Sequence, residues 1–229
     1  MCLCVRMHAC ACVCACVCVC VRMCLCMCVC VCVCVCVVKM LQKHEGILSV
    51  SPKVFLIQEH WLTPDNLTKL DRDSDGYVQF GSSAMSNMVN FGVLRGRPFG
   101  GVSSLINVNL RSVCTTVASS ERYYVTKIAD CIIINVYMPC SGTFNRNELY
   151  NDLLCDAFSW REKYPNCNCI IGGDFNVDLD SVNAFSTIIK NYISIRGLAR
   201  CDLTFSTVTK YKYINDALNC QSIIDFLNI

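Results

Sequence analysis

The first 38 residues constrain this chain more than any other feature, because they alternate cysteine with valine, alanine, leucine or methionine almost without interruption. Fifteen of the 23 cysteines lie before Lys39. Both alternating positions are apolar, so no face is polar, and no Gly, Pro, Asn or Asp is present to turn the chain. One strand of this length would span about 125 Å, far more than sheets use. We interpret residues 1–38 as a low-complexity repeat without a selected function, not as a domain, with a strong tendency to aggregate.

Three functional interpretations of this tract stay open. Arg22 divides its apolar residues into runs of 15 and 16, shorter than the ~20 residues that cross a bilayer, which disfavours a membrane span. A secretory signal would begin at Arg6, yet the apolar run continues well past the only small-residue cleavage site. Closely spaced thiolates bind soft metal ions such as Zn²⁺ or Cu(I), although ligands converge only where the chain turns. A thiol-rich metal-binding or membrane-associated protein is therefore one alternative function.

Residues 39–229 have the composition of one ordinary globular domain. They carry 18 basic and 18 acidic side chains, because the net charge of +2 comes from Arg6 and Arg22. Neutrality excludes a polycation that binds nucleic acid by phosphate neutralisation alone, but not a nuclease with a local basic rim. About 190 residues suffice for one sizeable core. The eight remaining cysteines are typical of an intracellular protein in a reducing compartment.

Apolar runs and helical spacing predict the elements of this part of the chain. Strands are expected over 54–57, 77–80, 91–94, 102–107, 112–117, 123–128, 131–137, 169–171 and 222–227. Helices are expected over 39–48, 146–163 and 182–193. Closely spaced strands mixed with helices predict an α/β fold in which two sheets pack together with helices outside.

Polar side chains follow three of these apolar runs directly. Glu59 follows VFLIQ, Tyr137 ends CIIINVY, and Asp174 and Asn176 follow IIGG. Strand ends of this kind meet at one edge of a sheet sandwich. Two carboxylates and a carboxamide suit Mg²⁺, and the glycines before Asp174 would let the backbone approach a substrate. Asp174 could then deprotonate an attacking water while Asn176 and Tyr137 donate hydrogen bonds to a phosphoryl oxygen.

Taken in order, QEHWL, RGRPFGG, INVYMP, GGDFNVDL and SIIDF make residues 39–229 similar to the endonuclease/exonuclease/phosphatase superfamily. The resemblance is strongest to the apurinic-like endonuclease domain of LINE-type non-LTR retrotransposons. It implies a four-layer αββα sandwich, a Mg²⁺ or Mn²⁺ site, no small-molecule cofactor, and DNA as the substrate that is nicked. It also implies a nuclear substrate and, in a full-length element, a reverse transcriptase as partner. A phosphoesterase of the same fold that acts on a substrate other than nucleic acid is the second alternative.

The resemblance implies a role for each matching residue. Glu59 corresponds to the metal-binding glutamate and Tyr137 to a tyrosine that contacts the phosphate. Asp174 and Asn176 correspond to the water-orienting and substrate-contacting pair, and Asp225 to the aspartate that orients a catalytic histidine. Gly100 and Gly101 are interpreted as structural. Arg95, Arg97 and Arg146 are interpreted as solvated loop charges, with phosphate contact as the alternative.

Two motifs of the superfamily are missing from the sequence. No Asn, Asp or Glu precedes Glu45, so the expected metal-site Asn is absent, and the only histidines are His8, His44 and His60. No Ser-Asp-His segment follows Asp225. Loss of a general acid/base group costs roughly 10²- to 10⁴-fold in rate, so we expect this polypeptide to be inactive or weakly active. Residues 31–38 are expected to take the place of the missing first strand and to supply packing without ligands.

Overall fold

The computed structural model describes residues 7–9, 15–23, 27–35, 53–73, 76–92, 99–200, 213–215, 220–222 and 227–228. Three of the expectations fall on other residues. The helix over 39–48, the basic residues Arg95 and Arg97, and Asp225 all lie outside the described residues.

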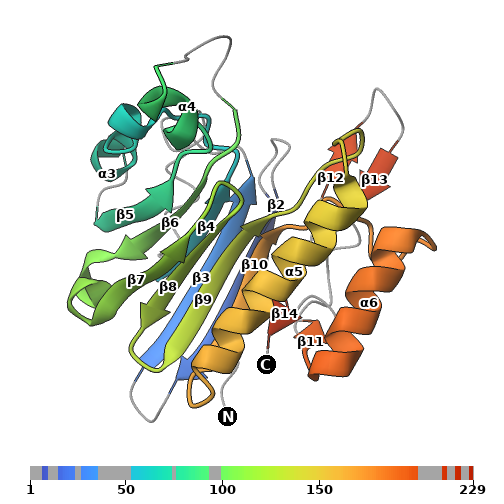
Figure 1. The fold of residues 1–229 in the computed structure, drawn as a ribbon. Helices are drawn as coiled ribbons and strands as arrows, with labels where there is room; N and C mark the ends of the chain where they lie inside the picture. Colours follow the sequence, from blue (N-terminus) through green and yellow to red (C-terminus); the bar gives the residue numbers. More distant parts are fainter. Residues whose placement is uncertain are drawn as a thin grey trace.

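Two six-stranded sheets form the centre of the molecule (Figure 1). The strand order of the first sheet is β1 (Met7–Ala9), β2 (Ala15–Met23), β3 (Met27–Val35), β4 (Val54–Gln58), β6 (Val102–Asn107) and β5 (Tyr77–Ser82). The order of the second is β11 (Ala199–Arg200), β14 (Leu227–Asn228), β10 (Asn168–Asp174), β9 (Cys131–Tyr137), β8 (Tyr123–Ile128) and β7 (Cys114–Ser119). A separate pair joins β12 (Tyr213–Asn215) to β13 (Cys220–Ser222).

The two sheets enclose an apolar core. Alternate residues of β4 and β6 face alternate residues of the second sheet, and this buried cluster contains Val54, Leu56, Ile106, Leu110, Ile128, Cys131, Ile133 and Ile170. The intervening Phe55 and Ile57 of β4 are buried as well. Burial on both faces explains why VFLIQ and CIIINVY are continuous apolar runs and not alternating ones.

Two long helices cover the outer face of the second sheet (Figure 1). The first, α5 (Arg146–Lys163), has the bounds that the leucine and aromatic spacing predicts. The second, α6 (Ala184–Arg196), begins two residues later than expected because Asn183 caps it, accepting a hydrogen bond from the Ser186 amide at 2.9 Å. Short helices occupy the loops of the first sheet: η1 (Pro64–Asn66), α3 (Lys69–Asp73), α4 (Ser86–Asn90) and η2 (Val108–Val113).

Two predicted strands are wrong at their starts. The strand expected over 91–94 begins with Phe91 and Gly92 in the turn that ends α4. The strand expected from 112 begins instead at Cys114, because η2 continues through Val113. In both places an apolar residue follows a short helix, which a pattern of hydrophobicity alone does not distinguish from a strand.

The cysteine-rich tract contributes three strands to the first sheet, so the expectation that it cannot turn is wrong. β1 and β2 pair antiparallel, β2 and β3 pair antiparallel, and β3 pairs in parallel with β4 from Val31 to Val35. Alternation with β-branched valine favours extended chain. Of the strand expected over residues 31–38, residues 31–35 lie beside β4 and residues 36–38 fall outside the described residues. In the described part of the chain, no helix has the length and apolar character needed to cross a membrane.

Candidate active site

The site is built where β4, β9 and β10 end. β9 and β10 run parallel with Tyr137 directly beside Asp174, so the two side chains leave the second sheet at the same edge. Glu59 follows the last residue of β4 in the first sheet. Because the sheets pack face to face, residues from both contribute to one site, as the sequence predicts.

Asn135 of β9, two residues before Tyr137, forms hydrogen bonds that join the second sheet to the first. Its side-chain amide donates to the carbonyl oxygens of Ile57 at 3.1 Å and Ser103 at 2.8 Å, and its side-chain oxygen accepts from the Gln58 side chain. Asn135 and Gln58 are both fully buried, so these bonds are made away from water and fix the spacing of the strand ends. Sequence reasoning missed this pair, although a polar residue inside each apolar run was a usable signal.

The hydroxyl of Tyr137 donates a hydrogen bond to the carboxylate Oε1 of Glu59. Burial, followed by the hydrogen bond to Glu59 and its negative charge, raises the pKa of Tyr137 far above its usual value. The phenol therefore stays protonated and remains a donor. The hydroxyl of Tyr137 thus lies against the carboxylate of the other sheet, and its expected contact with a phosphate stays a prediction.

Asp174 is only 5% exposed. Its Oδ1 accepts a hydrogen bond from the backbone N–H of Asn176 at 2.9 Å. Burial raises the pKa of Asp174 to about 6, the Asn176 hydrogen bond opposes this shift, and the negative charge of Glu59 adds to it. Tyr137 links the two carboxylates, because it hydrogen-bonds to Glu59 and lies directly beside Asp174 in the sheet.

Arg146 holds the turn that carries Asn176. Its guanidinium donates to the carbonyl oxygens of Pro139 at 2.9 Å and Asn176 at 2.7 Å, and it lies 3.8 Å from the ring centroid of Phe185. Arg146 was interpreted as a solvated charge or a phosphate ligand, and neither describes these contacts. Asn176 adopts a left-handed φ of 50° and donates its side-chain amide to the Met138 carbonyl at 2.9 Å, which leaves one amide hydrogen for another acceptor.

His60, which follows Glu59, is buried, and both of its ring nitrogens form hydrogen bonds to the backbone. Its Nε2 donates to the carbonyl of Ser82 at 3.0 Å, and its Nδ1 accepts from the amide of Leu62 at 3.0 Å, an arrangement that requires the neutral ring. Burial lowers the pKa of His60 to about 4, against the opposing effect of the Ser82 hydrogen bond. A Cβ on Gly101 would lie 2.2 Å from Cε1 of His60, so Gly101 makes room for the imidazole.

The glycine before Asp174 serves packing between strands. A Cβ on Gly173, which has a φ of +145°, would lie 1.9 Å from the carbonyl oxygen of Val136 in β9. This glycine was expected to let the backbone approach a substrate. In the structure, the close approach of the neighbouring strand β9 is what requires a glycine here. Its absent side chain lets β10 lie against β9 where Asp174 and Tyr137 emerge.

Glu59 and Asp174 fit a divalent cation. Within residues 53–73, 76–92 and 99–200 neither carboxylate makes an ion pair, although Glu59 raises the pKa of Asp174. No group of three or more His, Cys, Asp or Glu residues suited to a metal occurs among the described residues. Mg²⁺ is commonly held by one or two carboxylates with water and substrate oxygens completing its shell, so these two acids suffice.

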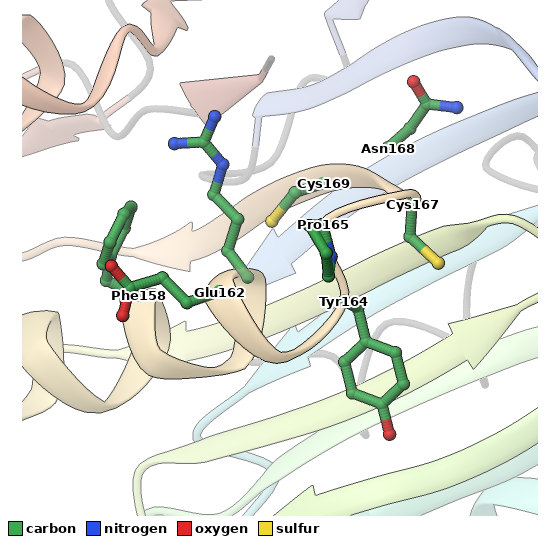
Figure 2. A pocket seen from close by; sticks show the side chains of 8 residues that line it. Phe158, Glu162, Tyr164, Pro165, Cys167, Asn168 and Cys169 are labelled. Atoms are coloured by element: carbon green, nitrogen blue, oxygen red, sulfur yellow. The ribbon is translucent and has the colours of Figure 1, made fainter.

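A cavity of about 390 Å³ lies elsewhere, at the far end of α5 (Figure 2). It is lined by Phe158, Arg161, Glu162, Tyr164, Pro165, Cys167, Asn168 and Cys169. The Cys169 thiol is buried, which raises its pKa to about 12 and keeps it neutral. β10 begins at this cavity and ends at Asp174, so the cavity and the site occupy opposite ends of the same strand.

The fold is that of the endonuclease/exonuclease/phosphatase proteins: an α/β sandwich of two sheets with outer helices. A 3' phosphatase from Neisseria, NExo, bound to a product DNA hairpin, matches with a TM-score of 0.58 and 12% identity over 80% of this chain and 79% of that chain. The 3'-5' exonuclease NExo from Neisseria meningitidis gives 0.56 and 14% over the same shares. A humanized D. rerio TDP2 gives 0.51 and 14%, covering 80% of this chain and 72% of that one. No protein-family model and no curated protein matches the sequence.

Proposed function

We propose that this chain is a divalent-metal-dependent phosphodiesterase of the endonuclease/exonuclease/phosphatase superfamily that acts on DNA. One observation carries the proposal: Tyr137 and Asp174 end neighbouring parallel strands, and the Tyr137 hydroxyl reaches the Glu59 carboxylate of the opposite sheet. This brings together three of the residues whose order in the sequence led to the resemblance. The solved structures of the same fold include a phosphatase with a DNA hairpin, which supports DNA as the substrate.

Glu59 and Asp174 would hold Mg²⁺ or Mn²⁺, which supplies charge stabilisation for the phosphoryl oxygens when bound. Asp174, whose Oδ1 is held by the Asn176 amide, is the proposed proton acceptor for the attacking water. Tyr137 orients Glu59, and the second amide hydrogen of Asn176 donates to a phosphoryl oxygen. Asp225 corresponds by resemblance to an aspartate that orients a catalytic histidine, but no histidine follows GGDFN in this sequence, so the proposal gives Asp225 no catalytic role.

We further propose that the domain derives from a LINE-type non-LTR retrotransposon and partners a reverse transcriptase on a nuclear DNA target. Residues 39–229 are the catalytic domain in this proposal, and residues 1–38 are a repeat that adds strands to its first sheet. The polypeptide of 229 residues is inactive or weakly active. His60 is the histidine whose side chain the structure describes, and both its ring nitrogens are engaged, so it is not available as a general acid or base.

A nicking assay on supercoiled plasmid tests the proposal with the full chain, in Mg²⁺ and in EDTA. We expect slow nicking that needs the metal and is lost in Asp174→Ala, but not in Asp156→Ala, which removes an exposed carboxylate of α5. Turnover near 1 s⁻¹, an ordinary rate for an enzyme, would contradict weak activity. Metal binding, measured as a Mn²⁺-dependent rise in Tm that Glu59→Gln abolishes, separates an inactive member from a wrong assignment. Absence of both nicking and metal binding would overturn the proposal.

A further inference from the structure

Trp61 combines exposure with a strained backbone. Its side chain is 44% exposed, and its φ of 55° lies in the left-handed region, which is an outlier for a bulky residue. Such strain persists only where the surroundings impose it, and it is concentrated at ligand-binding positions. The only other tryptophan of the chain, Trp160, shows the ordinary alternative: it packs against the core of the second sheet with the Lys163 ammonium 3.8 Å from its ring centroid.

The backbone that carries Trp61 is fixed on both sides. The Trp61 amide donates to the carbonyl of Gly100 at 3.0 Å. Its neighbour His60 is buried between Ser82 and Gly101, and the Leu62 carbonyl accepts from the Ser83 hydroxyl at 2.6 Å. These hydrogen bonds hold the loop that carries the partly exposed indole. Binding of a ligand to Trp61 would therefore cost less conformational entropy than binding to an aromatic residue on a flexible loop.

The position of Trp61 indicates what it contacts. It lies two residues after Glu59, a distance of at most about 7 Å along the chain. Phe99 precedes Gly100, whose carbonyl accepts from the Trp61 amide, and is a second exposed aromatic residue, 47% exposed. If the phosphate of a nucleotide is bound at Glu59, the base of that nucleotide can reach the Trp61 side chain. Aromatic rings stack on bases of any sequence, but only on bases whose faces are free.

We infer that Trp61 is a stacking position for an unpaired nucleobase adjacent to the phosphate at Glu59 and Asp174. This inference rests on the proposed function and narrows its substrate to DNA that is single-stranded, frayed or flipped out at the site. No ring contact or cation–π pair of Trp61 occurs within the described residues. The exposed part of the indole is therefore not taken up by another ring or by a cation of the described residues.

Fluorescence of Trp61 tests the inference without catalysis. In a Trp160→Phe background, Trp61 is the single tryptophan, and Trp160 lies roughly 20 Å along α5 from Arg146 at the site. The full chain is titrated in Ca²⁺, a hard cation that takes oxygen ligands as Mg²⁺ does, with a single-stranded thymidine oligonucleotide and with an abasic oligonucleotide of equal length and charge. We expect quenching by the first alone. The Trp61 variants have no tryptophan in this background, so their affinities are measured by the anisotropy of dye-labelled oligonucleotides. Trp61→Ala should weaken thymidine binding roughly 5- to 150-fold and leave abasic binding unchanged, whereas Trp61→Phe should retain most of the affinity.

Ile195→Ala, which removes an apolar side chain that is exposed on α6, serves as the matched control and should bind like the parent. Equal quenching by both oligonucleotides, or equal affinity of Trp61→Ala for thymidine, would overturn the stacking role while leaving DNA binding intact. Trp61 fluorescence that changes with protein concentration, and not on addition of oligonucleotide bases, would indicate that the ring lies in a contact between two copies of the chain. This result would also overturn the stacking role. Failure of either oligonucleotide to bind would overturn the proposed function itself.

Discussion

The Tyr137 hydroxyl donates a hydrogen bond to the Glu59 carboxylate, and this bond connects the last residue of a strand in one sheet to the residue after a strand in the other. The bond sets the orientation of the carboxylate that we propose as the metal ligand. Its removal should therefore affect metal binding and catalysis more than folding.

Tyr137→Phe should lower metal-dependent nicking and Mn²⁺ affinity by roughly 10- to 100-fold, because a hydrogen bond to a charged group contributes about 1.5–3 kcal/mol. Thermal unfolding should change little, since Glu59 is half-buried and water can replace the phenol. Tyr124→Phe is the control: its hydroxyl pairs with Thr116 at 2.8 Å in the β7–β8 hairpin. Equal losses of metal affinity in both variants would show that Tyr137 has no specific role.

Asp174→Asn should abolish nicking and stabilise the metal-free protein at pH 7. The folded protein holds the Asp174 proton up to about pH 6, whereas the unfolded chain releases it near 3.8. The folded state therefore binds more protons in this window, and the free energy of unfolding falls as pH rises through it, by about 3 kcal/mol. Asparagine removes that loss and can still accept from the Asn176 amide. Denaturant unfolding in EDTA measures the effect, and a variant less stable than wild type at pH 7 would disprove it.

His60 should produce the opposite slope over nearly the same range. Its pKa is about 4 in the folded protein and 6.5 in the unfolded chain, so the unfolded chain binds more protons between these values. This contribution to stability is complete above pH 6.5 and is lost as pH falls toward 4, again by about 3 kcal/mol. The two groups should nearly cancel in wild type. Unfolding curves from pH 4 to 6.5 should slope upward with pH in Asp174→Asn and downward in His60→Gln; matching slopes in the two variants would refute this.

Gly173→Ala should destabilise the protein by about 3 kcal/mol or more, because the new Cβ would meet the Val136 carbonyl at 1.9 Å. Gly142→Ala separates this clash from backbone strain. Gly142 has a φ of +87°, and a Cβ added there would have no neighbour within 4 Å, so we expect a loss of about 1–2 kcal/mol. Chemical denaturation compares the two variants, and similar losses would mean that the approach of β9 and β10 relaxes without cost.

The sequence predicted those parts of the fold that depend on local pattern. The strands of VFLIQ and CIIINVY and the helix from Arg146 to Lys163 were predictable because apolar spacing identifies the buried faces. The turns within the cysteine-rich tract were not, because no turn residue marks them. Their strands pair by backbone hydrogen bonds, which valine and cysteine permit at every position.

The convergence of the candidate residues was predictable from the sequence, but their individual contacts were not. Glu59, Tyr137, Asp174 and Asn176 follow apolar strands, so their convergence followed from the sheet geometry. The partner of Tyr137 and the two carbonyls bound by Arg146 depend on contacts between residues far apart in sequence. The left-handed backbone of Glu59 is likewise imposed by tertiary packing, whereas asparagine, the residue at position 176, adopts this conformation more readily than most residues.

The parallel pairing of β3 with β4 makes the sheet insensitive to the length of the repeat that supplies β3. Cysteine and valine alternate from Cys28 to Val37, and side chains in a strand alternate between faces with the same period of two. Sliding the strand by one Cys-Val unit places the same residue types opposite Val54 to Gln58 as before. Expansion or contraction by whole units therefore preserves the pairing of β3 with β4, whereas a change of a single residue exchanges the residue types on the two faces of the strand.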